Sequence, residues 1–353
     1  ARRSGTEQRV SRWAVVLAGG IGSRFWPLST PERPKQLLPL VTDKPLLRDT
    51  VDRLRPIVDP AHTLILTNAG LTKSIRALLG ELPPKNILEE PRPAGTAAAL
   101  TWAAISIERR EGRDATMICV HADWAIGDDD GFREALLKAE QVALDTESLV
   151  TVGVVPTRPD PGFGYVQPSD GRIASRVKRF IEKPDRASAE KMRNDGFLWN
   201  SGIFVWRVGD FLDEVAKHTP ELAVALGHAR KGSAAQFFES VMIPVSVDVG
   251  VLERSDRVMV VPGDFGWDDI GTWSALSRVR NKDEAGNVAT GDAHLLESSN
   301  NVVHCASGQV VMYGVNDLVV VVKEGLTLVT TTERASDLKR LVESLSATEI
   351  GKK

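Results

Sequence analysis

The sequence predicts an α/β protein: a Rossmann-like, mostly parallel sheet flanked by helices, followed by a small C-terminal β unit. Short apolar runs alternate with segments of helical periodicity from Trp13 to about Arg280, and the first run ends in a glycine-rich turn. Beyond Asn281 the pattern changes to short β runs separated by turn residues. Strands that alternate with helices imply right-handed crossovers, and hence parallel pairing.

Apolar and β-branched runs bounded by turn residues predict the strands, and apolar residues spaced three or four apart predict the helices. Strands are expected at residues 13–17, 62–67, 86–88, 115–120, 149–155, 162–166, 173–180, 203–206, 244–252 and 258–261. Helices are expected at residues 44–54, 71–79, 95–110, 132–146, 208–217 and 272–280.

The chain divides into three expected parts. The polar residues 1–12 are expected to be a disordered lead, since an untethered terminus is seldom ordered. Residues 13–285 form the main α/β domain. Residues 286–353 form the small β unit, which a helix at 334–345 closes.

Composition excludes several classes of protein. The 353 residues carry a net charge of −3, so no global basic field points to nucleic acid or to an anionic membrane surface. Cys119 and Cys305 lie in apolar runs without metal-type spacing, which argues against a disulfide framework. No apolar run reaches the length of a membrane span, and no signal-peptide core is visible. These features favour the cytoplasm.

The glycine-rich turn is the first candidate site. Gly19, Gly20 and Gly22 follow the first strand, where backbone N–H groups can approach an anion, and Arg24 and Lys35 add positive charge. The spacing fits neither the P-loop nor the dinucleotide fingerprint. The glycines alone fit an ordinary turn in an α/β domain equally well.

The whole stretch from residue 17 to residue 40 is more specific. It resembles the signature loop of the sugar-1-phosphate nucleotidyltransferases, G-G-x-G-x-R-x-x-P-L-[ST] followed by P-K, and most closely that of the mannose-1-phosphate guanylyltransferases. The resemblance implies that Arg24 binds the leaving phosphates and that Lys35 stabilises charge at the α-phosphorus. It also implies that the backbone of this loop binds the nucleotide, through Leu17, Ala18, Gly19, Gly20 and Gly22.

Two aspartates resemble the metal ligands of that family. Asp123 follows a buried strand, in the context His-Ala-Asp-Trp where the family usually has Pro-Ala-Asp-His. Asp269 matches the family pattern Trp-x-Asp-x-Gly, and its neighbour Asp268 is expected to point elsewhere. Two carboxylates suit Mg²⁺ when phosphates and waters complete its shell. Taken alone, Asp123 fits a turn or helix cap better.

Three further stretches match family motifs. Arg-Phe-Ile-Glu-Lys-Pro resembles the motif in which Glu182 binds sugar hydroxyls and Lys183 holds the sugar phosphate. Asn200, in Trp-Asn-Ser-Gly, offers a donor and an acceptor to the sugar, and Gly164 would let the hexose approach the backbone.

The third stretch is Gly95-Thr96, which opens a helix where free N–H groups can meet the nucleotide. The family usually has asparagine in place of Gly95.

The resemblance covers nearly the whole chain and implies one reaction. The substrates would be GTP and mannose 1-phosphate, the products GDP-mannose and pyrophosphate, and the cofactor Mg²⁺. It also implies a β-helix-like C-terminal unit and, by analogy, a possible homodimer. The alternatives are transfer with another hexose 1-phosphate or nucleotide, and a non-catalytic regulatory subunit that binds a nucleotide sugar. The charged residues Arg24, Lys35, Asp123, Lys183 and Asp269 are all present, which favours an enzyme over a regulatory subunit.

Overall fold

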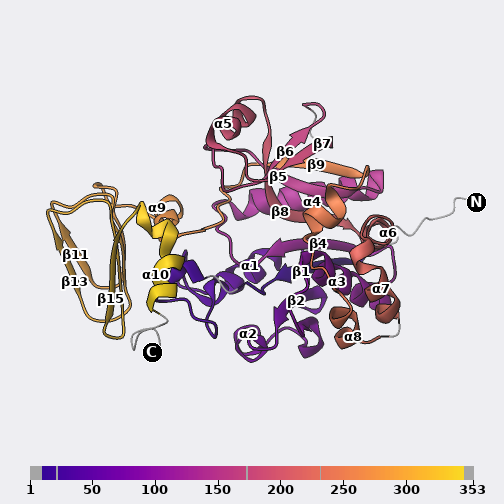
Figure 1. Cartoon of the computed structure of the whole chain (residues 1–353), viewed down its shortest axis with the longest axis horizontal. Coiled ribbons are helices and arrows are strands. Elements are labelled where there is room, and N and C mark those ends of the chain that lie inside the picture. Colours follow the sequence, from indigo (N-terminus) through magenta and orange to yellow (C-terminus); the bar gives the residue numbers. More distant parts are fainter. Residues whose placement is uncertain (1–9, 21–22, 172–173, 231, 346–353) are drawn as a thin grey trace, which may run out of the picture. The chain divides into compact units, whose positions relative to one another are not determined.

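The computed structural model describes residues 10–20, 23–171, 174–230 and 232–345 (Figure 1). The chain forms two compact units, each considered separately. Unit 1 comprises residues 1–19, 53–121 and 128–265, and unit 2 comprises residues 20–52, 122–127 and 266–353. Most of the predicted lead, residues 1–9, lies outside the described residues.

Unit 1 is built on a nine-stranded sheet with the order β3-β2-β1-β4-β8-β5-β9-β7-β6. Its strands are β1 Arg12–Leu17, β2 Thr63–Asn68, β3 Ile87–Glu90, β4 Thr116–His121, β5 Leu149–Val154, β6 Tyr165–Pro168, β7 Ser175–Ile181, β8 Leu198–Arg207 and β9 Val258–Gly263. The β3-β2-β1-β4 part is parallel, as is the β5–β9 pair. Strand β8 runs antiparallel to both β4 and β5, and β6 and β7 form the predicted antiparallel hairpin. The α/β prediction is confirmed, in a sheet that is mixed beyond β4.

Helices cover this sheet (Figure 1). Those of unit 1 are α2 Thr72–Leu78, α3 Thr96–Glu111, α4 Asp129–Thr146, α5 Arg186–Asn194, α6 Val208–His218, α7 Ala223–Arg230 and α8 Ala234–Glu239, while α1 spans Leu46–Leu54. Helix α3 is alanine-rich and buried along most of its length, because it packs against both the sheet and α6. No helix in the described part of the chain is long and apolar enough to cross a membrane.

The strand predicted at residues 244–252 is wrong. Residues Asp248–Leu252 form a π-helical turn, and the chain before them lies over the start of α3. The carbonyl of Val245 accepts from the Ala97 N–H (3.2 Å), and the Val247 N–H donates to the Thr96 hydroxyl (2.9 Å). These backbone groups therefore bond to a helix start instead of a strand.

Unit 2 contains the C-terminal strands. They are β10 Val288–Thr290, β11 Ala293–Leu296, β12 Val302–Cys305, β13 Val310–Tyr313, β14 Leu318–Lys323 and β15 Leu326–Thr331. Strands β10, β12 and β14 form one parallel ladder and β11 and β13 another, as expected of stacked β-helical turns. Helix α10, Leu338–Leu345, closes the unit after a 3₁₀ turn at Arg334–Asp337, in agreement with the prediction.

The same unit includes the segment after the glycine-rich turn. Phe25 and Trp273 pack in one apolar core with Val302 and Val319 of the C-terminal strands. The helix expected at 272–280 is a 3₁₀ turn, Trp273–Ala275, followed by α9, Leu276–Val279. The domain boundary at residue 285 stays a prediction.

Candidate active site

A short β-bridge holds the two predicted metal ligands in one neighbourhood of unit 2. Ala125 and Asp268 pair in antiparallel fashion, through backbone bonds of 2.9 and 3.0 Å. The bridge therefore brings together Asp123, two residues before Ala125, and Asp269, the residue after Asp268. These two aspartates lie 146 residues apart in the sequence (269 minus 123).

Lys35 joins these two residues. Its Nζ donates to Oδ2 of Asp123 (3.1 Å) and to the main-chain carbonyl of Asp269 (2.5 Å). The Lys35 side chain is only 8% exposed, whereas that of Asp123 is 39% exposed. A buried ammonium needs such partners, since an unpaired charge is costly to remove from water. The lysine is thus fixed beside a partly accessible carboxylate.

Arg24 and Asp269 both approach Gly271. A Cβ added to Gly271 would lie 2.8 Å from Oδ2 of Asp269 and 3.4 Å from Nη1 of Arg24. The final glycine of the Trp-x-Asp-x-Gly motif therefore leaves room for both side chains. Unit 2 thus brings together all four residues predicted to be catalytic, Arg24, Lys35, Asp123 and Asp269, which we call the Lys35 cluster.

Asp268 has a different environment. It is buried, and its carboxylate accepts from Nε and Nη2 of Arg278 (2.6 and 2.9 Å) and from the Ile270 N–H (2.9 Å). These bonds give Asp268 a structural role. They support the choice of Asp269 as the metal ligand.

Unit 1 brings together the four residues predicted to bind the sugar phosphate. The Asn200 N–H, on β8, donates to the Gly164 carbonyl (2.8 Å). A Cβ on Gly164 would lie 2.7 Å from Oε2 of Glu182, so this position must stay small. Lys183 forms an ion pair with Glu182, and both side chains are largely exposed. We call Gly164, Glu182, Lys183 and Asn200 the Asn200 cluster.

Sequence reasoning missed Asp248, which adjoins this cluster. Its Oδ1 accepts from Nδ2 of Asn200 (2.7 Å), so it fixes the orientation of that amide. Burial raises the pKa of Asp248; the bond from Asn200 and the charge of His121 oppose the rise, and Glu182 adds to it. The mistaken strand at 244–252 hid this residue, because a strand gave no reason to place it near Asn200.

Glu90 is a second residue that the prediction missed. Its Oε1 lies 3.6 Å from the position that a Cβ on Gly19 would take. Burial raises the pKa of the Glu90 carboxyl to about 7. Glu90 is the glutamate of the Glu-Pro pair that precedes Gly95 by a few residues, and this motif was the available signal. A partly buried carboxyl thus adjoins a glycine of the signature loop in unit 1.

The remaining predicted nucleotide contacts differ in accessibility. Leu17 and Ala18 are buried at the end of β1, and the Gly20 carbonyl accepts from Nε2 of Gln36 (2.9 Å). Gly22 lies outside the described residues.

At the start of α3, Gly95 has φ of +85° and Thr96 is the first helical residue. The Ala97 N–H already donates to the Val245 carbonyl, and the Thr96 hydroxyl oxygen already accepts from the Val247 N–H.

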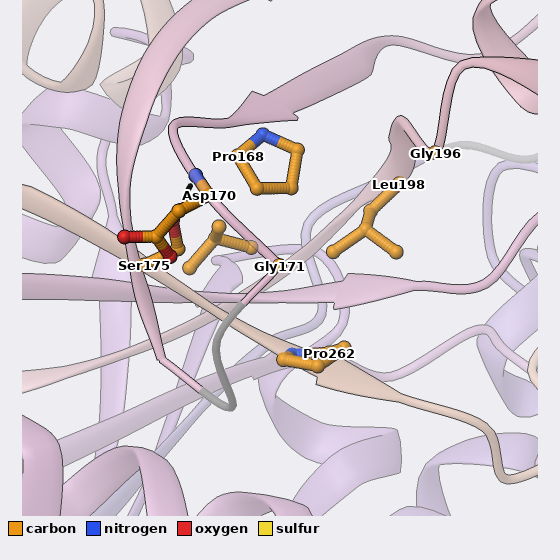
Figure 2. Close-up of a pocket in the computed structure, with 8 residues that line it drawn as sticks. Pro168, Asp170, Gly171, Ser175, Gly196, Leu198 and Pro262 are labelled. Carbon is orange, nitrogen blue, oxygen red and sulfur yellow. Dashed lines mark hydrogen bonds between the residues drawn. The ribbon is translucent and has the colours of Figure 1, made fainter.

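A pocket of about 170 Å³ lies elsewhere in unit 1, between the β6–β7 hairpin and β8 and β9 (Figure 2). Its apolar lining comes from Pro168, Leu198, Val260 and Pro262. None of the predicted site residues lines it. It therefore has no part in the candidate site.

Comparison with known proteins identifies the family. The sequence model of the nucleotidyl transferase family matches residues 13–286, and that of the MannoseP isomerase/GMP-like β-helix domain matches residues 291–345. The chain belongs to the nucleotidyl transferase family. The family membership predicted from the sequence motifs and the β-helix-like unit are both confirmed.

Relatives of this nucleotidyl transferase share most of its length. A mannose-1-phosphate guanylyltransferase of Klebsiella pneumoniae is 36% identical over 94% of this chain and 73% of its own. The same name belongs to an Escherichia coli protein that is 34% identical over 95% of this chain and 73% of its own. A Thermus thermophilus crystal structure, described as a mannose-1-phosphate geranyltransferase, superposes with a TM-score of 0.90. It is 32% identical and covers 96% of this chain and 100% of its own.

Nucleotidyl transferases generally use a divalent metal ion. Within the described residues, no group of three or more His, Cys, Asp or Glu side chains could hold a metal by itself. Asp123 and Asp269 offer two carboxylates, which suits an ion whose remaining ligands are substrate phosphates and waters. The donor set therefore fits a metal that is completed by the substrate.

Proposed function

We propose that this nucleotidyl transferase converts mannose 1-phosphate and GTP into GDP-mannose and pyrophosphate. The observation that carries the proposal is the Lys35 cluster, in which a buried lysine and an arginine of the signature loop meet two aspartates from two distant segments. Relatives named for this activity match over almost the whole chain, and their similarity supports the choice of substrates.

The reaction needs charge neutralisation more than proton transfer. A phosphate oxygen of mannose 1-phosphate forms a bond to the α-phosphorus of GTP, and the bond from that phosphorus to the bridging oxygen breaks. Pyrophosphate leaves with the electron pair of the broken bond. Because the attacking oxygen is already anionic near neutral pH, positioning and electrostatic stabilisation supply the catalysis.

The chain's own residues have distinct parts in this step. Lys35, held by Asp123 and the Asp269 carbonyl, places a fixed positive charge where negative charge grows at the α-phosphorus. Arg24 binds the β- and γ-phosphates that leave. Asp123 and Asp269 would hold Mg²⁺, which when bound neutralises phosphate charge.

The Asn200 cluster would bind the sugar. Glu182 accepts hydrogen bonds from hydroxyl groups, and Asn200 can both donate and accept. Lys183 supplies the positive charge for the sugar phosphate. Gly164 keeps the space beside Glu182 free of a side chain.

Glu90 gives a physical reason for guanine. Guanine presents two donors, N1–H and the 2-amino group, and one carboxylate can accept from both. Adenine presents an acceptor at N1, which would repel the same carboxylate. We therefore assign Glu90, next to Gly19, to recognition of the base.

The test is pyrophosphate release from a matrix of nucleotides and sugar phosphates. GTP, ATP, UTP and dTTP would each be combined with mannose 1-phosphate and with glucose 1-phosphate. We expect GTP with mannose 1-phosphate to give the highest kcat/KM. A higher value for another pair would replace the proposed substrates, and tight binding of GDP-mannose without any turnover would indicate the regulatory subunit instead.

We also propose that the chain forms a homodimer through its C-terminal strands. Leu296, Val311 and Tyr313, on the paired strands β11 and β13, expose 52, 73 and 66% of their surface. Sedimentation of the wild type and of Val311→Lys tests this. A monomeric wild type would rule the dimer out.

A further inference from the structure

Arg280 is a half-buried arginine that forms no salt bridge with a carboxylate in the described part of the chain. It follows α9, and its Nη1 donates to the Thr290 hydroxyl (2.5 Å). Burial lowers the pKa of its guanidinium, and only the charge of Asp43 opposes this. Among the described residues Arg280 makes no salt bridge, whereas nearby Arg278 pairs with Asp268 at 2.6 Å. Burying a cation without a counter-ion is costly.

His304 lies beside it with an unused polar atom. Thr290 and His304 are register partners on β10 and β12, so the residue that Arg280 contacts adjoins the histidine. His304 is 8% exposed, and its ring lies 5.7 Å from that of Trp273. Its Nδ1 has no hydrogen-bond partner in the described part of the chain. Buried polar atoms normally have a partner, so this one calls for an explanation.

The charge of a second arginine, Arg33, also acts on His304. The pKa of His304 is lowered to about 4 by burial and then by the charges of Arg280 and Arg33. Arg33 closes a tight turn with Thr30 through two backbone bonds of 3.1 Å, and its side chain forms no ion pair with any described residue. It stands two residues before Lys35.

We propose that Arg280 and His304 form a binding site for a phosphate-sized oxyanion in unit 2, to which the charge of Arg33 adds attraction. Guanidinium groups match oxyanions in charge and in hydrogen-bond geometry, and the neutral imidazole can donate through Nδ1–H. The anion would supply the counter-charge that Arg280 lacks and the partner that Nδ1 lacks. The site uses none of the residues of the Lys35 cluster, so it stands apart from the proposed function.

Inorganic phosphate is the probe, and the six histidines make NMR of the isotope-labelled 353-residue chain a direct readout. The His304 signal is assigned with His304→Gln. We expect it to shift and saturate as phosphate replaces chloride at constant ionic strength. The pKa of His304 should rise, because the anion offsets the two guanidinium charges.

Variants that each remove one positive charge distinguish binding at this site from a general attraction of anions to the protein. Arg280→Gln should weaken phosphate binding at His304 about tenfold or more, which corresponds to the loss of one charge-assisted contact. Arg33→Gln, at an exposed position, should weaken it as well and is safe for the fold. Lys282→Gln removes the same charge two residues from Arg280 and should leave binding unchanged.

Arg24→Gln separates this site from the nucleotide phosphates. The His304 shift should persist in that variant, even if the proposed activity is lost. The proposal is overturned if His304 does not respond to phosphate, if Lys282→Gln weakens binding as much as Arg280→Gln, or if Arg24→Gln abolishes the response.

Discussion

Two adjacent aspartates illustrate how environment separates residues of the same type. Asp268 is buried, and Arg278 and a backbone N–H occupy its oxygens. Asp269 turns its carboxylate towards Gly271, in the same place as Arg24. Asp268 therefore belongs to a structural ion pair, whereas Asp269 lies among the residues of the Lys35 cluster.

Asparagine substitutions should separate these two roles. Asp269→Asn should lower kcat about a hundred- to thousandfold, as the loss of an electrostatic group in an active site typically does, and leave unfolding unchanged. Asp268→Asn should lower the free energy of unfolding by about 2 kcal/mol, because Arg278 loses its charged partner. Steady-state kinetics and urea unfolding of both variants check this. Full activity of Asp269→Asn would contradict the proposed metal role.

Glu90 should make nucleotide-sugar binding depend on pH. With a pKa of about 7 it is half-ionised near neutrality, and only the carboxylate can accept both guanine donors. GDP-mannose should bind more weakly one unit below pH 7 than one unit above, and Glu90→Gln should remove the difference. Calorimetric titration measures both. If the affinity of Glu90→Gln for GDP-mannose depended on pH as strongly as that of the wild type, a group other than Glu90 would be responsible.

The same group affects folding stability, with a defined sign. Its pKa is raised from 4.5 to about 7 in the folded state, so folding favours the protonated form. The stability of the wild type relative to Glu90→Gln should therefore be highest below about pH 4.5. It should fall as pH rises through about 7, and urea unfolding across this window tests the sign.

At the scale of elements, the start of α3 depends on a segment about 150 residues later in the chain. Residues 244–247 bond to the first turn of the helix instead of joining the sheet. Gly95 allows this approach, because its φ is +85° and a Cβ would lie 2.3 Å from the Val245 carbonyl oxygen. A left-handed glycine thus fixes how a loop covers a helix.

Two glycines of similar conformation allow a matched comparison at the two ends of this helix. Gly112→Ala, with φ of +90° and open space, should cost only the strain of that conformation, about 1–3 kcal/mol. Gly95→Ala should cost clearly more, since the Val245 carbonyl must move away from the Ala97 N–H. Thermal and urea unfolding measure both. If both variants lost the same free energy of unfolding, the loop at residues 244–247 would be able to move away from α3 without an energetic cost.

At the scale of the whole molecule, each compact unit carries one cluster of the predicted site residues. Unit 2 holds the Lys35 cluster, and unit 1 holds the Asn200 cluster with Glu90. Neither unit is organised around a metal-ligand cluster, because the described residues contain no group of three or more suitable side chains. The apolar cores of the two units account for their folding.

Removal of divalent metal should therefore separate activity from stability. A chelator should abolish pyrophosphate release, and Mg²⁺ should restore it, since Asp123 and Asp269 would hold the ion together with substrate phosphates. The melting temperature of the substrate-free chain should not change. A large fall in that temperature would point instead to a structural metal.

The sequence by itself determined the α/β class, the hairpin, the short C-terminal strands and the residue types of both clusters. Each depends on local periodicity or on a short motif, which a single stretch of chain contains. Only the tertiary structure decided that residues 244–247 cover α3, that Asp248 orients Asn200 and that Glu90 adjoins Gly19. It also decided that Arg280 bonds to Thr290, the strand neighbour of His304, and forms no salt bridge with any residue that the structure describes. These facts depend on partners that are distant in the sequence, and no local pattern specifies which partner a backbone carbonyl or a charged side chain will meet.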